Sequence, residues 1–503
     1  MITASGARGR RPRKQERGRL ESVTPSWVES LASDFAESLR RGAPRLDSLR
    51  TVGERDASAA EAFSQAAADR DLAPSAEHWI APLLRSARPG RGAQRLLEVA
   101  LARRRAGGKI DPRRAPALPL VLGSSDFLAR LLVQRPDWVE ELEKPHSGDG
   151  EPVRPAPEWG AIREVKYRGL LRIAAAELMG RPFRESLLAL SNLADGCLIA
   201  GMECAARELG TKPPTLFALG KLGGRELNFS SDVDLLFLYV PPRGDDNLEK
   251  NRAASHFIRH LKKQMELPTQ DGFIYRVDLA LRPEGAAGAL ANSVDAALDY
   301  YEAFGAEWER QMLIRLRGLT GPQQVVEAFS EGIRPFVYRR SIDPAVLGAV
   351  RDMKRRIEGE RRDARRDLDA DLKEGPGGIR DVEFLIQSLQ LFWGGQAPEI
   401  RTGNTLEALA QLNRRKLLPD ATASELSTSY IWLRRAEHAL QLVEEQQTAK
   451  FPRDASAQLG LARRMGYGEA SGDDARNHLL DDWSVFRNQV RSHFEALVLS
   501  PDL

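Results

Sequence analysis

The chain has little of what marks a secreted or membrane-spanning protein. Its 503 residues include only two cysteines, Cys197 and Cys204, too few for a disulfide framework or a four-cysteine zinc site. Because they stand seven positions apart in a helical pattern, we expect both to be small core residues. No run approaches the 18 or so consecutive apolar residues typical of a membrane-spanning helix. These absences favour a reduced, cytoplasmic protein with no membrane partner.

The chain also lacks a strong net charge of either sign. Lys and Arg number 74 and Asp and Glu 71, which leaves +3. Residues 1–20 hold seven basic residues and one acid, Glu16, and therefore carry +6. The remaining residues sum to −3. We predict a basic, disordered tail on a body without the basic surface that nucleic-acid binding requires, so nucleic acid is not an expected partner.

Helical periodicity dominates the rest of the sequence, with a change of pattern near the middle. We predict a helical N-terminal region over 21–150, a central domain over 151–322 and a C-terminal helical bundle over 323–503. Three short apolar runs bounded by Pro or Gly predict strands, namely 214–219, 232–240 and 272–281. Everything after residue 294 is expected to be helical. The predicted fold class is α+β, predominantly helical, with a small mixed sheet.

Carboxylates in two of these runs form the main candidate site. Asp232 and Asp234 are two residues apart on an expected strand, so their side chains face the same side. Asp278 interrupts another apolar run and could share their pocket. Clustered carboxylates repel one another unless a cation joins them, and hard oxygen ligands suit Mg²⁺ or Mn²⁺. Three such groups could hold metal ions that stabilise a phosphoryl displacement.

An isolated Asp-x-Asp is more often a solvated pair than a metal site. Two features favour the metal site here. Both acids begin an apolar strand, and a Gly-rich turn with Ser230 and Ser231 precedes them. Glycines let a backbone approach phosphate closely, and serines offer donors to it. His256 and His260 are four apart on an expected helix, but they lack a third ligand nearby, which favours a surface or packing role.

At these residues the sequence resembles the bifunctional glutamine synthetase adenylyltransferase/adenylyl-removing enzyme family of the polymerase-β-like nucleotidyltransferase superfamily. The resemblance covers about residues 115–495 and rests on several motifs together. These are, in chain order, 123–130 (GSSDFLAR), 136–138 (PDW), 171–174 (LRIA), 220–239, 268–273 (PTQDGF), 276–279 with 281–283, 307–311 (EWERQ), 377–384 (GGIRDVEF) and 433–438 (LRRAEH).

The resemblance implies a nucleotidyltransferase module of the amino-terminal, adenylyl-removing type. Family members usually carry two such modules, whereas residues 323–503 contain no second GKLGG or SDxD sequence. The implied reaction is phosphorolysis, in which phosphate removes AMP from the modified tyrosine of glutamine synthetase and leaves as ADP. Asp232, Asp234 and Asp278 would then be catalytic and bind Mg²⁺ or Mn²⁺. Phosphate or nucleotide would be bound by Gly220, Lys221, Gly223, Gly224, Ser230, Ser231 and Arg282.

Several alternatives stay open at this point. The chain could instead adenylylate glutamine synthetase from ATP, or act as a non-catalytic module that binds glutamine synthetase or a PII-type signalling protein. A further set of motif residues could surround the site or form structural ion pairs, namely Glu309, Arg310, Arg380, Asp381 and Glu383. The chain also departs from the family pattern at Ala280, often an arginine, and at Glu284, often a bulky apolar residue.

Overall fold

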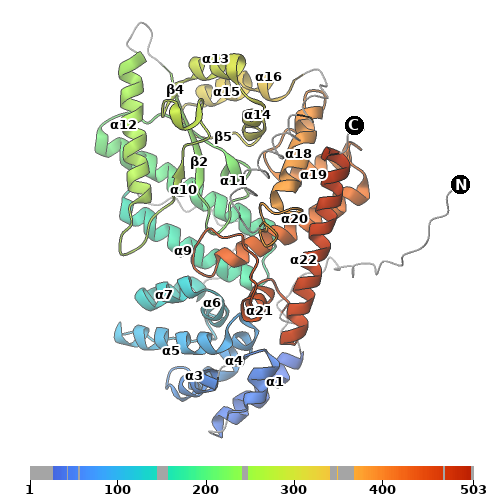
Figure 1. Cartoon of the computed structure of the whole chain (residues 1–503). Coiled ribbons are helices and arrows are strands. Elements are labelled where there is room, and N and C mark those ends of the chain that lie inside the picture. The colour runs from blue at the N-terminus through green and yellow to red at the C-terminus, as the bar shows by residue number, and fades with distance from the viewer. Residues whose placement is uncertain are drawn as a thin grey trace, which may run out of the picture.

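The computed structural model describes residues 26–41, 44–54, 57–143, 157–240, 247–339, 348, 368–467 and 471–499. It is predominantly helical with one small mixed sheet (Figure 1), which confirms the predicted fold class. The predicted basic tail at residues 1–20 lies outside the described residues.

The sheet has five strands in the order β3-β2-β1-β5, with β4 also paired to β2. Their bounds are β1 Thr215–Ala218, β2 Val233–Tyr239, β3 Val277–Asp278, β4 Asn292–Ser293 and β5 Arg317–Thr320. Strand β1 is antiparallel to β2 and β5, whereas β3 and β4 run parallel to β2.

Two of the predicted strands agree with the structure, and the third is much shorter than expected. The chain forms a turn closed by the Thr269–Gly272 bridge and enters the sheet only at Val277 and Asp278. Strand β5 contradicts the expectation that everything after residue 294 is helical. All four of its residues are partly exposed, so the segment lacks the apolar run that identifies a buried strand.

The N-terminal helices form a compact group at one end of the molecule (Figure 1). Their bounds are α1 Ser26–Arg40, α2 Leu46–Thr51, α3 Ala57–Ala68, η1 Ala73–Ser75, α4 Ala76–Arg85, α5 Pro89–Arg105, α6 Leu118–Ser124, α7 Asp126–Gln134, η2 Pro136–Val139 and α8 Glu140–Glu143. The start of helix α7 is capped by Ser125, whose Oγ accepts a hydrogen bond from the Leu128 amide.

Three long helices connect this group to the sheet. They are α9 Trp159–Leu178, α10 Phe183–Leu209 and α12 Asn247–Glu266, and the short α11 Gly220–Gly223 follows β1. Helix α10 carries both cysteines, which are buried as expected. By length and composition alone it is apolar enough to cross a membrane, but 61% of its most apolar window is buried inside the protein. Its packing against α9 and α12 is that of a core helix.

The remaining helices cover one face of the sheet and form the C-terminal part. They are η3 Gly285–Ala287, α13 Val294–Phe304, α14 Glu307–Leu313, α15 Gln323–Gly332, α16 Arg334–Val337, α18 Ile379–Trp393, η4 Pro398–Ile400, α19 Thr405–Arg414, α20 Asp420–Gln441, α21 Ala455–Arg464, α22 Gly472–Phe494 and the π-helical η5 Glu495–Leu499. Helix α22 runs along one side of the molecule from α21 towards α18 and α19 (Figure 1).

Three hydrophobic cores hold these parts together. The largest runs from the N-terminal helices through α9, α10 and α12 to one face of the sheet, so the N-terminal region and the sheet share a core. A second core packs the other face, including Phe217 and Leu236, against α13, α15 and α16. The third lies within the C-terminal helices. The carboxylate-bearing strands β2 and β3 are therefore held on a rigid base.

Candidate active site

Two of the three candidate carboxylates lie side by side in the sheet. In the parallel pairing of β2 with β3, Asp234 is directly opposite Asp278, so both side chains leave the same face. Burial, followed by the negative charges of Asp278 and Asp232, raises the pKa of Asp234 to about 6, while Lys373 and Lys221 oppose the change. Such a pair stores electrostatic repulsion that a cation would relieve.

A glycine makes room for the Asp234 carboxylate. Gly220 has a φ of +53°, and a Cβ placed there would lie 2.0 Å from Asp234 Oδ2. The amide of Leu219 donates to the backbone oxygen of Asp234 at 2.9 Å. The turn after β1 is therefore built around this carboxylate, and no residue other than glycine fits at position 220 without displacing it.

Asp232 lies just before β2 and is held by an arginine. Arg276 Nε donates to Asp232 Oδ1 at 2.5 Å, and its Nη2 donates to Ser230 Oγ at 3.3 Å. Asp278 Oδ1 accepts from the amide of Ala280 at 2.7 Å. The structure therefore brings the three carboxylates into one region, while Asp232 is engaged with Arg276.

The carboxylate oxygens of this region are of the kind that binds a hard divalent cation, but the three side chains do not stand close enough together to form a metal site in this structure. In the described part of the chain, no group of three or more Asp, Glu, His or Cys side chains stands close enough together to hold a metal ion. Asp234 and Asp278 offer adjacent carboxylate oxygens, and the pKa of Asp234 is raised first by burial and then by the negative charge of Asp278. Asp232 would have to turn away from Arg276 to join them.

The Gly-rich turn packs against other backbone in this structure. A Cβ at Gly223 would lie 1.9 Å from the Arg315 carbonyl oxygen, and one at Gly224 would lie 2.6 Å from that of Gly403. The amides of both glycines donate to carbonyls within the turn, at Leu219 and Gly220. These two glycines allow close helix and loop packing, which is a role that the sequence pattern does not distinguish from phosphate binding.

The two serines of the motif also have protein partners. Ser230 Oγ donates to the Glu445 carbonyl at 2.9 Å, and the Ser230 amide donates to Gln441 Oε1 at 3.0 Å. Ser231 Oγ accepts from the Asn228 amide at 3.3 Å. The turn before β2 is therefore fixed to the end of α20 and the segment that follows it.

Lys221 is directed towards α20. Its ammonium lies 3.0 Å from Glu437 Oε1, and burial lowers the pKa of Lys221 to about 8 although Glu437 opposes the change. Glu437 also accepts from Asn228 Nδ2 at 2.6 Å, and the fully buried Arg434 donates to Asn228 Oδ1. The sequence motif at 433–438 contains both α20 residues, but spacing alone gives no sign that they support the turn at 220–228.

Arg282 holds a loop together. Its guanidinium donates to the carbonyls of Leu279, Ala286, Gly288 and Ala289 at 2.5–3.2 Å. Burial lowers the pKa of Arg282. Its donors in this structure therefore shape the segment that follows Asp278.

Two of the further motif residues, Glu309 and Arg310, lie on α14. Glu309 accepts from Tyr300 and from the amide of Ala306, and Arg310 binds the carbonyls of Phe336 and Val337. These contacts fasten α14 to its neighbours.

The residues of the GGIRDVE motif make separate contacts. Arg380 pairs with Glu374 at 3.2 Å, and Asp381 Oδ2 accepts from the Gly377 amide at 2.7 Å. Glu383 pairs with the buried Arg315 at 3.0 Å. Burial alone would raise the pKa of Glu383, but Arg315 and then Arg434 lower it to about 2.

A pocket of about 720 Å³ opens beside the carboxylates. Asp232 and Asp278 line it together with Arg259 and Lys262 of α12 and with Arg276. The two α12 residues were missed by sequence reasoning, because basic residues on an expected surface helix carry no signal of their own. The pocket combines carboxylates that could bind a cation with bases that could bind an anion.

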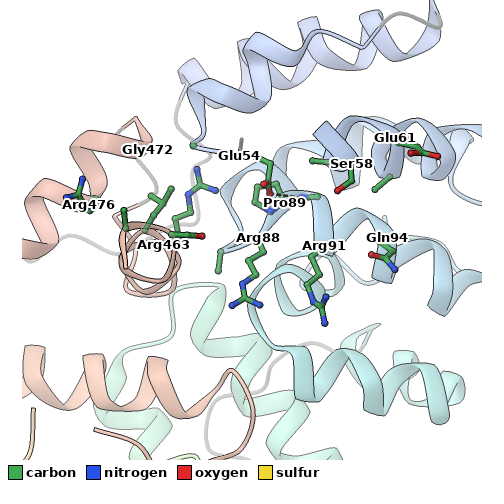
Figure 2. A pocket seen from close by; sticks show the side chains of 18 of the residues that line it. Glu54, Ser58, Glu61, Arg88, Pro89, Arg91, Gln94, Arg463, Gly472 and Arg476 are labelled. Atoms are coloured by element: carbon green, nitrogen blue, oxygen red, sulfur yellow. Dashed lines mark hydrogen bonds between the residues drawn. The ribbon is translucent and has the colours of Figure 1, made fainter. Parts of the chain in front are cut away.

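A second hollow of about 870 Å³ lies far from this chemistry, between α3, α5, α21 and α22. Figure 2 shows its side chains, including Arg88 and Arg91 of the α5 start and Arg463 of α21. Arg88 and Arg91 both bind Asp126, and Arg463 donates to the Ser86 carbonyl. None of the candidate carboxylates lines this hollow.

Comparison with known proteins identifies relatives for most of the chain. Residues 116–332 match the family model described as glutamate-ammonia ligase adenylyltransferase, and residues 351–498 match the one described as GlnD PII-uridylyltransferase. The first range contains all three carboxylates.

Two curated relatives carry the name bifunctional glutamine synthetase adenylyltransferase/adenylyl-removing enzyme. The protein from Thioalkalivibrio sulfidiphilus is 35% identical over 429 residues, which cover 76% of this chain and 42% of the relative. The protein from Stenotrophomonas maltophilia is 35% identical over 440 residues, which cover 80% of this chain and 45% of the relative. The chain thus spans less than half the length of these relatives.

Proposed function

We propose that this chain is a nucleotidyltransferase that regulates glutamine synthetase, and that it removes AMP from the adenylylated tyrosine of that enzyme by phosphorolysis. The observation that carries the proposal is the in-register pair of Asp234 and Asp278, seated on Gly220, within the range that matches the adenylyltransferase family. The relatives' names supply the protein substrate, and the likeness of motifs to the adenylyl-removing module supplies the direction.

The proposed reaction exchanges one phosphorus–oxygen bond for another. An oxygen of inorganic phosphate bonds to the phosphorus of the tyrosyl-AMP linkage, the bond from that phosphorus to the tyrosyl oxygen breaks, and the tyrosine takes up a proton. The products are ADP and unmodified glutamine synthetase. No redox partner is needed.

A divalent cation, for which we propose Mg²⁺ or Mn²⁺, would be held by Asp234 and Asp278 with Asp232, and would neutralise charge on the phosphoryl oxygens. The chain's own residues do the rest. The rigid β2–β3 pairing fixes the two carboxylates relative to each other, and Gly220 fixes how far Asp234 projects. Arg276 holds Asp232 beside the pocket mouth.

The buried contacts from α20 would act by positioning. Glu437 ties Lys221 and Asn228 to the C-terminal helices, so the turn that carries Gly220 cannot shift freely. In this proposal Lys221 and Ser230 align the turn, and their direct contact with phosphate stays a prediction.

The adding reaction, with ATP as the AMP donor, is the second candidate. The description of the matching family model as an adenylyltransferase favours it. A role in binding a PII-type protein is a further candidate, for which the match of residues 351–498 to a model named for PII-uridylyltransferase is the support.

The test is an assay of the purified chain with adenylylated glutamine synthetase, Mg²⁺ and inorganic phosphate. We expect release of ADP that depends on phosphate and that is abolished in a variant carrying Asp232→Asn and Asp234→Asn. Asp299→Asn, an exposed acid on α13 outside the site, is the matched control. Full activity of the double variant would contradict the assignment of the carboxylates.

The direction of the reaction is tested with labelled ATP and unmodified glutamine synthetase. We expect no transfer of label to the protein substrate. Transfer of the label, without phosphate-dependent release of ADP in the first assay, would establish the adding reaction in its place.

A further inference from the structure

The pocket beside the carboxylates contains an arginine with no protein partner among the described residues. Most of the pocket's other charges are already paired, since Arg276 binds Asp232 and Lys262 binds Glu266. Arg282 is engaged by loop carbonyls. The remaining base is Arg259.

Arg259 lies on α12, at the wall of the pocket, with its side chain exposed to solvent. Across the part of the chain that the structure describes, it makes no hydrogen bond or ion pair. Asp278 lines the same pocket and forms no ion pair with another described residue, and its only hydrogen bond in the described structure comes from the Ala280 amide. The pocket thus presents one unpaired cation and one unpaired carboxylate to the same space.

This combination fits one ligand class. A guanidinium offers donors in a planar fork that matches the oxygens of a phosphate group, and it stays charged at any physiological pH. A phosphate group near Asp278 needs a cation between its oxygens and the Asp278 carboxylate, because the two groups repel each other. It also needs a basic side chain to bind its remaining oxygens. Arg259 is the base that the pocket leaves available.

We propose that Arg259 forms an anion subsite that holds the attacking phosphate, which becomes the β-phosphate of ADP. This inference rests on the proposed function for the identity of the phosphate. It assigns to α12 a role in recognising the co-substrate, separate from the carboxylates that would hold the metal.

A direct binding experiment tests the subsite without glutamine synthetase. Calorimetry with Mg²⁺ compares the binding of ADP and of AMP to the full chain, because AMP lacks the phosphate that Arg259 would hold. Arg259→Ala should weaken ADP binding about tenfold to a hundredfold, as expected for loss of a hydrogen bond to a charged group, and leave AMP binding unchanged. Arg259→Lys should restore part of the loss.

Arg252→Ala is the matched control. Arg252 is an exposed arginine on the same helix, two turns earlier, and it does not line the pocket. The Arg252→Ala variant should bind ADP as the unaltered protein does. Equal weakening of ADP and AMP by Arg259→Ala, or an equal loss in both alanine variants, would overturn the proposal.

Steady-state kinetics separates this proposal from the proposed function. With adenylylated glutamine synthetase, Arg259→Ala should raise the KM for phosphate at least tenfold, with a smaller change in kcat. An active protein whose phosphate KM is unchanged by Arg259→Ala would overturn the subsite and leave the function standing. If the unaltered protein releases no ADP from adenylylated glutamine synthetase, the proposed function is overturned. If Arg259→Ala still weakens the binding of ADP and not of AMP, the subsite is supported.

Discussion

At the residue scale, the position most tightly constrained by the candidate site is Gly220. It combines a left-handed backbone conformation with direct contact to the Asp234 carboxylate. The first property disfavours any side chain by about 1 kcal/mol. A side chain in contact with Asp234 would also push the Asp234 carboxylate away from Asp278. The two effects can be separated with a control glycine that has the left-handed conformation but lacks the contact.

Gly220→Ala should therefore abolish most nucleotidyl transfer while leaving the protein folded. Gly210→Ala is the control, because Gly210 has a φ of +61° and a Cβ at that position would meet nothing within 4 Å. Gly210→Ala should lose about 1 kcal/mol in the free energy of unfolding, measured by denaturant titration, and Gly220→Ala should lose more because its Cβ also collides with Asp234. Only Gly220→Ala should lose activity, and loss of activity in both would show that the clash with Asp234 is not the cause.

Single residues were predictable where their chemistry is unusual for their surroundings. Asp232, Asp234 and Asp278 stand out because acids interrupt apolar strands, and the structure brings them into one region. Arg282 and Ser230 were predicted to meet phosphate, but in the structure their donors bind backbone carbonyls. Sequence shows which donors exist and cannot show which carbonyls lie near them, since those carbonyls come from distant or irregular segments.

At the element scale, the strands illustrate the limit of pattern recognition. Strands β1 and β2 are continuous apolar runs buried along most of their length, and the sequence predicts both. Strands β4 and β5 are short or partly exposed, so they pair through backbone hydrogen bonds without an apolar signature. The helices were easier to predict because their periodicity extends over ten or more residues.

Helix α18 meets α20 and the segment before β5 through a buried ion pair that gives a testable dependence on pH. Arg315 binds Glu383 at 3.0 Å, and Tyr430 lies 3.4 Å from the same carboxylate. The pKa of Glu383 falls from an ordinary 4.5 to about 2, because attraction to Arg315 and Arg434 outweighs burial. A lowered pKa means that the stabilisation is fully present above pH 4.5 and is lost as the pH falls towards 2.

Glu383→Gln should therefore lower the free energy of unfolding at pH 7 by about 3 kcal/mol, because it leaves Arg315 buried without its main partner. The difference from the unaltered protein should shrink as the pH falls from 4.5 towards 2. Denaturant titrations at several pH values measure it. The exposed Glu331→Gln is the control and should show no such trend; a difference for Glu383→Gln that stays constant with pH would contradict the ion-pair explanation.

At the scale of the whole molecule, the segment after α20 joins parts that are far apart in sequence. Ser125 Oγ donates to the Leu442 carbonyl, and the Phe127 amide donates to the Val443 carbonyl at 3.0 Å. Ser230 donates to the Glu445 carbonyl. The N-terminal helices, the turn before β2 and the C-terminal helices therefore meet at residues 441–445.

This junction was beyond prediction from sequence. The sequence predicts helices and a small sheet, but the contacts at residues 441–445 join partners more than 200 positions away. Their identity depends on how the helices cross, which periodicity does not specify. The hydrophobic core that the N-terminal helices share with the sheet could not be predicted for the same reason, because it also depends on how the helices cross.

The most deeply buried ion pair of the junction is that of Lys166 on α9 with Glu445. Both side chains are almost fully buried, and the Lys166 ammonium also lies 4.1 Å from the centre of the Tyr167 ring. Burial lowers the pKa of Lys166, with Glu445 opposing the change. Lys166→Met should therefore cost about 3–5 kcal/mol in the free energy of unfolding, because it leaves a buried carboxylate without its counter-charge.

The double variant Lys166→Met with Glu445→Gln tests whether the pair is what matters. It should cost less than the sum of the two single variants, since no unpaired charge remains buried. Denaturant titration of all four proteins gives the coupling energy. Because Ser230 is attached to the same segment, Lys166→Met should also reduce nucleotidyl transfer more than the double variant does. Additive costs would mean that the pair does not couple the N-terminal helices to the turn that precedes the carboxylates.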